Sequence, residues 1–431
     1  MNNVVLDTNV LLEQTFEAVL ESFTEPTTLV LPHVVLKEVD KFKQGHESKN
    51  EYSRAAIRFL DKLRLQGNLR EGVAVGNHIV KIYLKEEEID PSKPDYDIIL
   101  TAKKFDAKLV SQDIHARVIA DALEVDSTSF APNDVDANKL YTGKTSFVLA
   151  PEEIDIWNRT NQLRLPDDIL SNQLVYLLDE YENVIGKGIK DPNKDLVVPL
   201  ERSYEAWKVK PKSNNDEQAF LMELCMNKDI DFVTAIGPSG CGKTLLALAC
   251  ALEQTFRRET YKKITIMRPL VAVGNDIGYL PGNKLEKLED WMASTFDALD
   301  YLLTDYTPKD LNPNLPTKEK IYHMVESGTL ELEAMTYIRG RSLPDQIIIV
   351  DDCQNMTAHE AATIITRAGE GSKVIFLGDL SPKQIDNHRL TPGSNGLSYV
   401  IDRFQGQDIV GHITMETVVR SRLAQLGVEL L

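Results

Sequence analysis

The chain of 431 residues contains only four cysteines. Cys225, Cys241, Cys250 and Cys353 form no C-x-x-C pair, and Cys241 lies in a glycine-rich loop. So few cysteines at these spacings argue against a disulfide framework and against a zinc site. A reducing compartment suits this composition, and the sequence therefore predicts a cytoplasmic protein.

Long apolar runs are also missing. No stretch approaches the roughly 18 apolar residues that a membrane-spanning helix requires, so we expect no membrane partner. The N-terminus has no basic region followed by an apolar core and a cleavage site, which predicts that the chain carries no secretory leader.

Positive charge is scarce, because 48 Lys and Arg stand against 66 Asp and Glu, for a net charge of −18. This balance argues against a protein held to nucleic acid over its whole surface by phosphate attraction. It leaves room for local basic loops that bind nucleic acid within an acidic protein. The length predicts two or three domains.

The pattern of apolar runs predicts three domains of α/β class. Residues 1–130 alternate apolar runs with amphipathic stretches, which favours a parallel sheet covered by helices. Residues 131–212 are rich in proline, asparagine and aspartate, and we interpret them as a small β-rich connector ending in a polar linker, WKVKPKSNNDEQ. In residues 213–431 the α/β alternation returns.

The strongest local motif is GPSGCGKT, which matches G-x-x-x-x-G-K-[ST] between a predicted strand and a predicted helix. Glycines let the backbone wrap phosphates closely, so that N–H groups and the helix N-terminus face the anion. Lys243 would reach the β- and γ-phosphates of ATP, and Thr244 would bind Mg²⁺. The predicted nucleotide-binding loop comprises Gly237, Pro238, Ser239, Gly240, Cys241, Gly242, Lys243 and Thr244.

A nucleotide site needs a second carboxylate for Mg²⁺ and a group that orients the attacking water. The stretch IIIVDD supplies both: we expect Asp351 to hold Mg²⁺ through water, and Asp352 stands where a glutamate often acts as the base. The shorter aspartate would move the water or slow hydrolysis. In SKVIFLGDLSPKQID, Asp379 is either a γ-phosphate sensor or a plain helix cap.

Four motifs, IGPSGCGKT, RPLVAVGNDIGYLPG, YIRGRSLPDQIIIVDDCQN and GDLSPKQID, stand in this order within residues 210–425. They closely resemble the PhoH-like ATPases, a branch related to superfamily 1 helicases, which implies a RecA-like P-loop NTPase fold. The chain departs from the family in DDCQN, where D-E-A-Q-N is usual, and in GNDIG, where G-E-x-[LI]-G is usual. The first departure bears on the rate of hydrolysis rather than on nucleotide binding.

The resemblance implies roles for three residues outside the loop. Gln218 would contact adenine, Gln384 would sense the γ-phosphate, and Arg420 would be an arginine finger, which often comes from a neighbouring subunit. Without the resemblance, Gln218 is a linker glutamine and Arg420 a surface arginine on the terminal helix. Relatives form hexameric rings, so the resemblance implies a homo-oligomer, most simply a hexamer.

Three further arginines belong to the same motifs. The resemblance implies that Arg339 and Arg341 would touch nucleic acid or a neighbouring subunit, whereas without the resemblance a solvated loop is the better interpretation. For Arg268, the sequence is compatible with a structural role and with a role facing the substrate.

Carboxylates follow the predicted strands of residues 1–130. Asp7 ends the first strand, Glu38 follows the second, Asp95 and Asp97 open a helix, and Asp113 ends KLVSQD. Because the carboxyl ends of parallel strands meet at one edge, these acids would repel one another unless cations neutralised them. Mg²⁺ or Mn²⁺ suits such oxygen ligands and could activate water for attack on a phosphodiester. The alternative for each acid alone is helix capping.

The stretches V-L-D-T-N, V-x-x-E-V, D-x-D-I-I-L-T-A and V-S-Q-D resemble, in order, the PIN-domain ribonucleases. The resemblance implies an acidic cluster of Asp7, Glu38, Asp95 and Asp113. Asp97 would be an alternate or additional metal ligand, although the D-x-x-I-x-x-x-A spacing favours Asp95, because Ala102 lies seven positions after it. Asn9 or Thr8 would orient the Asp7 carboxylate.

Both modules act on or around RNA in relatives. We therefore predict an ATP-dependent RNA-unwinding ribonuclease, in which the ATPase feeds single-stranded or structured RNA to a PIN site that uses Mg²⁺ or Mn²⁺. The alternative is an ATP-regulated assembly that binds RNA or protein, with an inactive or independently acting PIN module. The presence of all four acids counts against a degenerate module.

Overall fold

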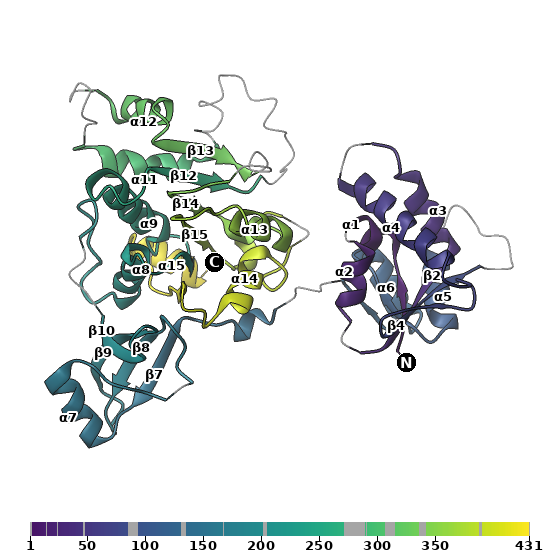
Figure 1. Cartoon of the computed structure of the whole chain (residues 1–431), viewed down its shortest axis with the longest axis horizontal. Coiled ribbons are helices and arrows are strands. Elements are labelled where there is room, and N and C mark those ends of the chain that lie inside the picture. Colours follow the sequence, from purple (N-terminus) through teal and green to yellow (C-terminus); the bar gives the residue numbers. More distant parts are fainter. Residues whose placement is uncertain are drawn as a thin grey trace. The chain divides into compact units, whose positions relative to one another are not determined.

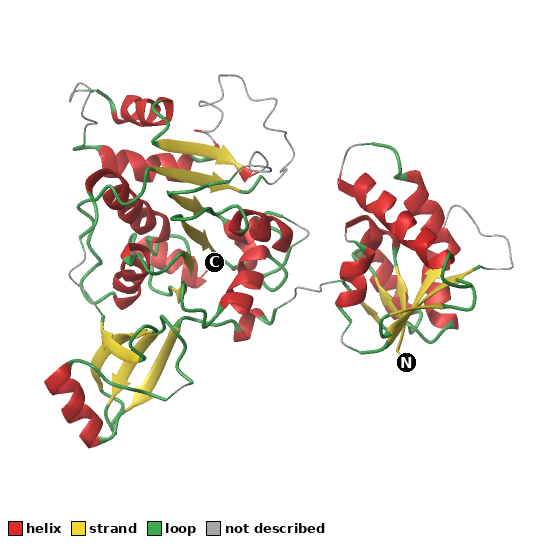
Figure 2. Cartoon of the chain, viewed as in Figure 1, coloured by secondary structure: helices red, strands yellow, loops and turns green. Residues whose placement is uncertain are grey.

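The computed structural model describes residues 2–13, 15–23, 25–45, 48–84, 94–130, 135–166, 168–200, 205–270, 289, 291–306, 315–335, 342–387 and 390–430. The chain forms two compact units, Met1–Pro132 and Asn133–Leu431 (Figure 1). Strands and helices alternate in both units, as the predicted α/β class requires (Figure 2). The finer domain limits at residues 130 and 212 stay predictions.

The first unit is built on a six-stranded sheet with the order β3-β4-β2-β1-β5-β6. β3 pairs antiparallel with β4, and the other neighbouring strands are parallel. The strands are β1 (Asn2–Leu6), β2 (Thr27–Pro32), β3 (Val73–Val75), β4 (His78–Tyr83), β5 (Lys108–Val110) and β6 (Ser127–Thr128). The helices are α1 (Thr8–Glu13), α2 (Phe16–Glu21), α3 (His33–Lys41), α4 (Ser48–Arg64), α5 (Pro94–Lys104) and α6 (Ile114–Ala122).

Three central strands of this sheet end together. β1 pairs in parallel with both β2 and β5, and the backbone N–H of Asp7 donates to the carbonyl of Val110 at 2.9 Å. Helices α1, α3 and α6 begin within a few residues of these strand ends. The residues that link strand to helix therefore gather at one edge of the sheet, which is the edge where the acids were expected.

The second unit begins with a small sheet of order β10-β9-β8-β7, in which only the β7–β8 pair is parallel. This sheet matches the expected β-rich connector. Its elements are a 3₁₀ turn η1 (Ala137–Lys139), β7 (Lys144–Val148), α7 (Pro151–Thr160), β8 (Leu174–Leu178), β9 (Val184–Asp191) and β10 (Leu196–Pro199).

The stretch WKVKPKSNNDEQ is not the polar linker that its composition suggested. Trp207 is only 1 % exposed, its Nε1 donates to the carbonyl of Leu302 at 2.8 Å, and its ring lies 4.6 Å from that of Tyr306. Burying an indole and satisfying its N–H outweighs the polar character of the neighbouring residues. The start of the stretch therefore packs against α11 (Ala293–Leu303) and Tyr306, which follow it in the same unit, instead of separating two domains.

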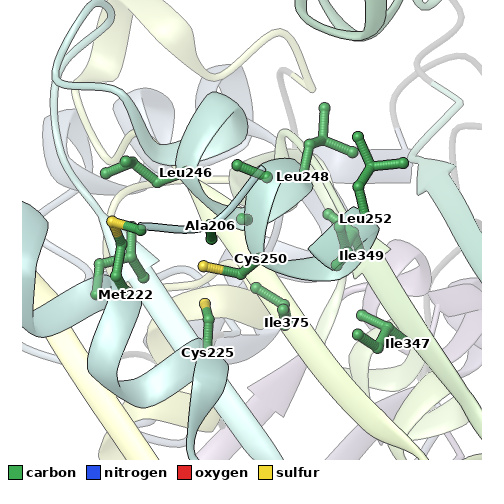
Figure 3. Close-up of a cluster of buried hydrophobic side chains, with 14 of the residues drawn as sticks. Ala206, Met222, Cys225, Leu246, Leu248, Cys250, Leu252, Ile347, Ile349 and Ile375 are labelled. Atoms are coloured by element: carbon green, nitrogen blue, oxygen red, sulfur yellow. The ribbon is translucent and has the colours of Figure 1, made fainter. Parts of the chain in front are cut away.

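The larger sheet of the second unit is entirely parallel, with the order β13-β12-β14-β15-β11-β16. In β14, Ile347 and Ile349 join the core that includes α8 and α9, whereas Ile348 and Val350 join the core that includes α13 and α14. Helices thus cover both faces, which explains why the strand is apolar throughout. Figure 3 shows Ile347, Ile349 and Ile375 with Leu248 in the first of these cores.

The elements of this domain follow in chain order. The first half comprises α8 (Asp216–Met226), β11 (Phe232–Ile236), α9 (Lys243–Leu252), a π-helical turn η2 (Glu253–Arg257), β12 (Lys263–Arg268), α11 (Ala293–Leu303) and α12 (Thr317–Glu326). The second half comprises β13 (Leu330–Ala334), β14 (Gln346–Val350), η5 (Cys353–Asn355), α13 (Ala358–Ile365), β15 (Lys373–Gly378), η6 (Pro382–Gln384), α14 (Gly396–Phe404), β16 (Val410–Thr414) and α15 (Arg422–Leu430). Within the described ranges, no helix has the length and apolarity needed to cross a membrane. All four cysteines are buried as free thiols.

Candidate functional sites

The glycine-rich loop joins the end of β11 to the start of α9, which begins at Lys243. Gly242 has a positive φ of 101°, and a Cβ there would lie 3.0 Å from Nε2 of Gln218. Glycine adopts this backbone without strain and leaves room for the glutamine. The loop can therefore wrap an anion at the N-terminus of α9, as the motif predicts.

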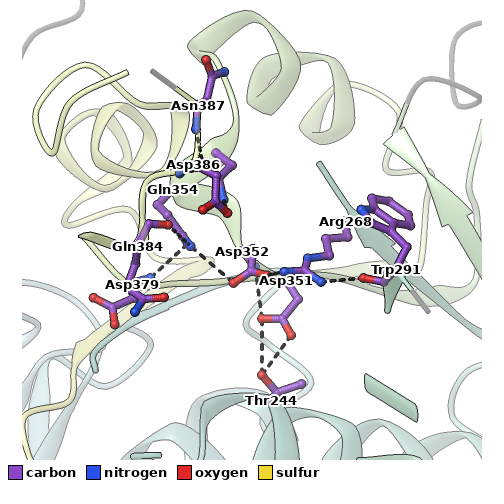
Figure 4. Close-up of polar contacts among 11 residues, drawn as sticks. Thr244, Arg268, Trp291, Asp351, Asp352, Gln354, Asp379, Gln384, Asp386 and Asn387 are labelled. Atoms are coloured by element: carbon purple, nitrogen blue, oxygen red, sulfur yellow. Dashed lines mark hydrogen bonds and ion pairs between the residues drawn. The ribbon is translucent and has the colours of Figure 1, made fainter. Parts of the chain in front are cut away.

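Lys243 and Thr244 lie at the start of α9 with different partners. The Lys243 ammonium donates to the carbonyls of Gly237 and Pro238, at 2.5 and 3.1 Å. Thr244 Oγ1 donates to the Asp351 carboxylate, at 3.1 Å from Oδ2 and 3.3 Å from Oδ1. The hydroxyl and the carboxylate expected to share Mg²⁺ thus come from separate elements and meet at the end of β14 (Figure 4).

Asp351 lies in an unfavourable environment for a negative charge. Burial, and then the neighbouring Asp352 charge, raise the pKa of Asp351 to about 6, while Lys243 and Thr244 oppose that rise. A nearby cation stabilises the ionised form of a carboxylate in such an environment, because it offsets the free-energy cost of burying the negative charge. The donor set of Thr244 and Asp351 therefore suits the Mg²⁺ that accompanies a nucleotide.

Asp352 is held by an arginine. Its backbone is left-handed, with φ of 55°, and its Oδ2 forms an ion pair with Nη2 of Arg268. Arg268, the last residue of β12, also donates from Nη1 to the carbonyl of Trp291 at 2.6 Å. One guanidinium therefore links Asp352 to β12 and to Trp291 (Figure 4).

Gln354 joins the ends of β14 and β15. Its Nε2 donates to Asp352 Oδ1 at 3.3 Å and to the carbonyl of Gln384 at 3.1 Å, and its Oε1 accepts from the Asp379 N–H at 3.0 Å. Asp379 in turn accepts from the backbone N–H of Ser381 at 2.9 Å, whereas the residue that precedes the 3₁₀ turn η6 is Ser381 itself. Gln384 itself is exposed. The network in Figure 4 thus ties Asp352 to the predicted sensor segment.

Gln218 is a buried helix residue, only 3 % exposed, and not a linker glutamine. Its side chain accepts from the N–H of Lys212 at 2.8 Å and donates to the carbonyl of Cys241 in the glycine-rich loop at 2.9 Å. The residue therefore lies beside the nucleotide loop, where the family resemblance places it.

Arg420 lies against the glycine-rich loop of its own chain. The N–H of Val419 donates to the carbonyl of Gly240 at 3.1 Å, and a Cβ on Gly240 would lie 3.1 Å from Cβ of Arg420. The Arg420 side chain is exposed. Arg339 and Arg341 lie outside the described residues.

In the first unit, Asp7 is 5 % exposed and accepts three side-chain or backbone hydrogen bonds at the end of β1. The donors are the Thr8 N–H at 2.6 Å, Asn9 Nδ2 at 2.8 Å and the hydroxyl of Ser111. Burial, which is the largest effect, and the charges of Asp95 and Glu38 nevertheless raise the pKa of Asp7. Asn9 orients this carboxylate, as predicted.

Glu38, Asp95 and Asp113 approach the same edge. Burial, and then the charges of Asp113 and Glu38, raise the pKa of Asp95. Glu38 accepts from Thr8 Oγ1 at 2.6 Å, and Asp113 caps α6 by accepting from the His115 N–H at 2.8 Å. The structure therefore brings the four predicted acids within electrostatic reach of one another.

Asp97 lies elsewhere on α5. It lines a cavity together with Lys81 and Lys104, and the pKa shifts of Asp7 and Asp95 include no effect from it. Residues two positions apart on a helix point in nearly opposite directions. The geometry thus favours Asp95 over Asp97 at the acidic edge.

The acidic edge fits an oxygen-seeking cation by chemistry, because burial, and then the charges of neighbouring carboxylates, raise the pKa of Asp7 and Asp95. Among the described residues, however, no three His, Cys, Asp or Glu side chains lie close enough to form a ready-made metal site. Binding a cation would therefore require the side chains to move towards each other.

Three residues of these sites were not assigned by the sequence. Ser111 bridges two predicted acids, because its hydroxyl donates to Asp7 and accepts from the N–H of Asp113 at 3.0 Å. Arg268 and Gln354 hold Asp352. Each lies inside a motif noted above, and that membership was the only available signal.

These folds and sites define a P-loop NTPase domain joined to an N-terminal domain with an acidic strand edge. The family description "PhoH-like protein" matches residues 208–431, and "PIN domain" matches residues 4–131. The chain belongs to the PhoH-like protein family and carries a PIN domain at its N-terminal end.

Several relatives match over nearly the whole chain. Protein PhoH2 of Bacillus subtilis (strain 168) is 38 % identical over 455 aligned positions, covering 99 % of both chains. Protein PhoH2 of Mycolicibacterium smegmatis is 30 % identical, covering 99 % of this chain and 96 % of its own. The order of the two domains is therefore shared with these proteins.

Among solved structures, the Pif1 helicase from Candida albicans aligns at 12 % identity with a TM-score of 0.25, over 51 % of this chain and 43 % of that one. The Hef helicase domain of Pyrococcus furiosus aligns at 12 % identity with a TM-score of 0.24, over 45 % of this chain and 37 % of that one.

Proposed function

We propose that the protein is an ATP-dependent RNA-unwinding ribonuclease. The observation that carries the proposal is the edge formed by Asp7, Glu38, Asp95 and Asp113, in one chain with a P-loop NTPase site. Thr8 links Asp7 to Glu38 by hydrogen bonds, and Ser111 links Asp7 to Asp113 in the same way. Burial, followed by neighbouring charges, raises the pKa of Asp7 and Asp95. ATP and Mg²⁺ or Mn²⁺ are the proposed cofactors. The cytoplasm is the proposed location, on the ground of the free thiols.

At the nucleotide site, the loop N–H groups and Lys243 bind the phosphates, and the ammonium exchanges its loop carbonyls for phosphate oxygens. Thr244 and Asp351 would hold Mg²⁺, which neutralises charge on the phosphates when bound. Asp352 orients the attacking water and accepts its proton, while Arg268 and Gln354 hold its carboxylate in place.

At the acidic edge, Asp7, Glu38, Asp95 and Asp113 would hold the cation, which supplies an activated water and stabilises the leaving oxygen. Asn9, Thr8 and Ser111 orient the Asp7 and Glu38 carboxylates by the hydrogen bonds described above. Such outer partners keep ligand oxygens aimed at one point.

The test is RNA degradation by the full chain on a single-stranded RNA and on a hairpin with a single-stranded tail, with and without ATP. We expect cleavage of the single strand without ATP, and cleavage of the hairpin stem only with ATP and Mg²⁺. A gel assay with a non-hydrolysable ATP analogue as control measures both. Hairpin cleavage that is equal with and without ATP would refute the coupling, and an ATPase rate that no RNA stimulates would refute the unwinding.

Arg420 is proposed to act on the γ-phosphate of its own subunit, because it lies beside Gly240 of the same chain. Arg420→Ala should lower ATP hydrolysis about a hundredfold, the usual cost of removing one charge-stabilising donor. The oligomer itself, a hexameric ring, is part of the proposal.

Mixing variants distinguishes this arrangement from a finger supplied by a neighbour. Arg420→Ala and Lys243→Ala subunits, co-assembled in equal amounts, should remain inactive because every subunit lacks one essential group. Recovery of ATP hydrolysis in the mixture would show that Arg420 acts across the subunit interface. Arg422→Ala, on the exposed start of α15, is the matched control.

A second candidate function is an ATP-regulated assembly that binds RNA or protein through an inactive PIN module. It is favoured by one observation, the lack of three metal-ligating side chains at binding distance among the described residues. Titration with Mn²⁺, followed by electron paramagnetic resonance, separates the two: metal binding that is lost in Asp7→Asn supports the nuclease, and no binding supports the assembly.

A further inference from the structure

A cavity of about 510 Å³ lies along α5 on the side that carries Asp97. This volume lies in the range of roughly 300–1,000 Å³ that is typical of ligand-binding pockets. Three cationic side chains line it, Arg70, Lys81 and Lys104, against one carboxylate among its described lining residues, Asp97. In a chain with a net charge of −18, a local excess of positive charge marks a place suited to an anion.

Two aromatic rings share the cavity with these cations. Tyr83 and Phe105 meet edge to face, with ring centroids 5.1 Å apart and planes at 77°. Lys104 Nζ lies 4.7 Å from the Tyr83 ring centroid and donates to its hydroxyl at 2.7 Å. Lys81 Nζ lies 5.7 Å from the centroid of Phe105. Aromatic rings among lysines and arginines are the surface that single-stranded nucleic acid uses, with bases on rings and phosphates on cations.

The cavity lies at the same end of the sheet as the acidic edge. Tyr83, the last residue of β4, pairs with Pro32 at the end of β2, and Val30 of β2 pairs with Val5 of β1. Tyr83 and Asp7 therefore lie level with each other, two strands or about 10 Å apart. A single strand whose phosphodiester lies at the acidic edge can reach the cavity within its next nucleotides.

We propose that this cavity binds a nucleotide of the single-stranded RNA substrate, next to the bond that the acidic edge cuts. The inference rests on the proposed ribonuclease function and names the part of the domain that holds its substrate. The base packs against Tyr83 and Phe105, and its phosphates face Lys81, Arg70 and Lys104. Asp97 accepts hydrogen bonds from the amino group of the base, which gives this carboxylate a role in RNA binding and not in holding metal.

Cross-linking tests the site without requiring cleavage. The full chain carrying Asp7→Asn is irradiated with a single-stranded RNA that contains 4-thiouridine at successive positions, and the cross-linked peptides are identified by mass spectrometry. We expect cross-links at Tyr83 or Phe105 from one or two neighbouring positions of the RNA. Cross-links confined to the ATPase domain would overturn the proposal.

Salt dependence of binding tests the cationic side chains. For a single strand, each phosphate that no longer meets a cationic side chain should reduce the slope of log affinity against log salt by about 0.7. Lys81→Ala, in the Asp7→Asn chain, should therefore flatten this slope and weaken binding of the short single strand, as measured by fluorescence anisotropy. Lys103→Ala is the matched control for the loss of one lysine from the same domain. Lys103 lies on α5, donates to the carbonyl of Leu123 and does not line the cavity.

The possible outcomes distinguish a failure of the proposed nucleotide site from a failure of the proposed ribonuclease function. Equal slopes for Lys81→Ala and Lys103→Ala, with no cross-link at Tyr83 or Phe105, overturn the nucleotide site even if the wild-type chain cuts RNA. A cross-link there in a chain whose wild type cuts no RNA overturns the ribonuclease and leaves the binding site standing. Competition by inorganic phosphate as strong as by RNA would show a simple anion site and also overturn the proposal.

Discussion

Asp7→Asn should abolish RNA cleavage while leaving ATP hydrolysis at its wild-type rate. The change removes the charge that the acidic edge needs for a cation and keeps the shape of the side chain. Loss of an outer partner alone costs such sites 10–100-fold, so the loss of Asp7 itself should exceed about a hundredfold. The measurement is the rate of degradation of a single-stranded RNA, beside the ATPase rate of the same preparation.

Folding should not confound this result. Burial raises the pKa of Asp7 above its value in the unfolded chain, so ionising the group costs free energy of folding above the unfolded pKa. A neutral asparagine avoids that cost at neutral pH, and we expect the free energy of unfolding to be unchanged or higher. Asp121→Asn, an exposed acid on α6, is the matched control and should cut RNA normally. Wild-type degradation by Asp7→Asn would refute the nuclease assignment.

Lys243→Ala should have the opposite effect, abolishing ATP hydrolysis while leaving cleavage of unstructured RNA intact. Its ammonium is the only side-chain cation of the predicted phosphate loop, and without it the developing charge on the γ-phosphate loses its main side-chain donor. Removing one such donor usually costs 10²–10³-fold in rate. Cleavage of a hairpin stem should be lost together with hydrolysis, because unwinding depends on ATP.

Lys228→Ala controls for the removal of a positive charge, because Lys228 is exposed in the same domain. It should leave both activities unchanged. Should Lys243→Ala still cut the hairpin at the wild-type rate, the ATPase does not feed RNA to the acidic edge, and the two modules act independently.

The local motifs predicted most of the nucleotide site. GPSGCGKT lies between β11 and α9, and IIIVDD ends at Asp351 and Asp352, the first of which lies beside Thr244. These features follow from short stretches whose backbone geometry depends on glycines and strand ends nearby in sequence. The same reasoning placed Asp7, Glu38, Asp95 and Asp113 at one edge, because parallel strands end together.

Contacts between distant segments were not predictable in this way. Trp207 looked like part of a polar linker, yet it is buried against residues almost 100 positions later. Arg268 pairs with Asp352, 84 positions away, and nothing in either motif specifies the partner. The direction of a side chain was also not predictable with certainty, since the motif spacing favoured Asp95 but left Asp97 as an alternate or additional ligand.

The sequence by itself determined the class of each domain, the phosphate loop and the set of acids, because repeating apolar patterns and local turns impose them. Only the tertiary structure decided which acid faces the edge, which arginine holds Asp352, and that Arg420 lies beside Gly240 of its own chain. The physical reason is that packing selects one partner for each polar group among many that are compatible with the same local pattern.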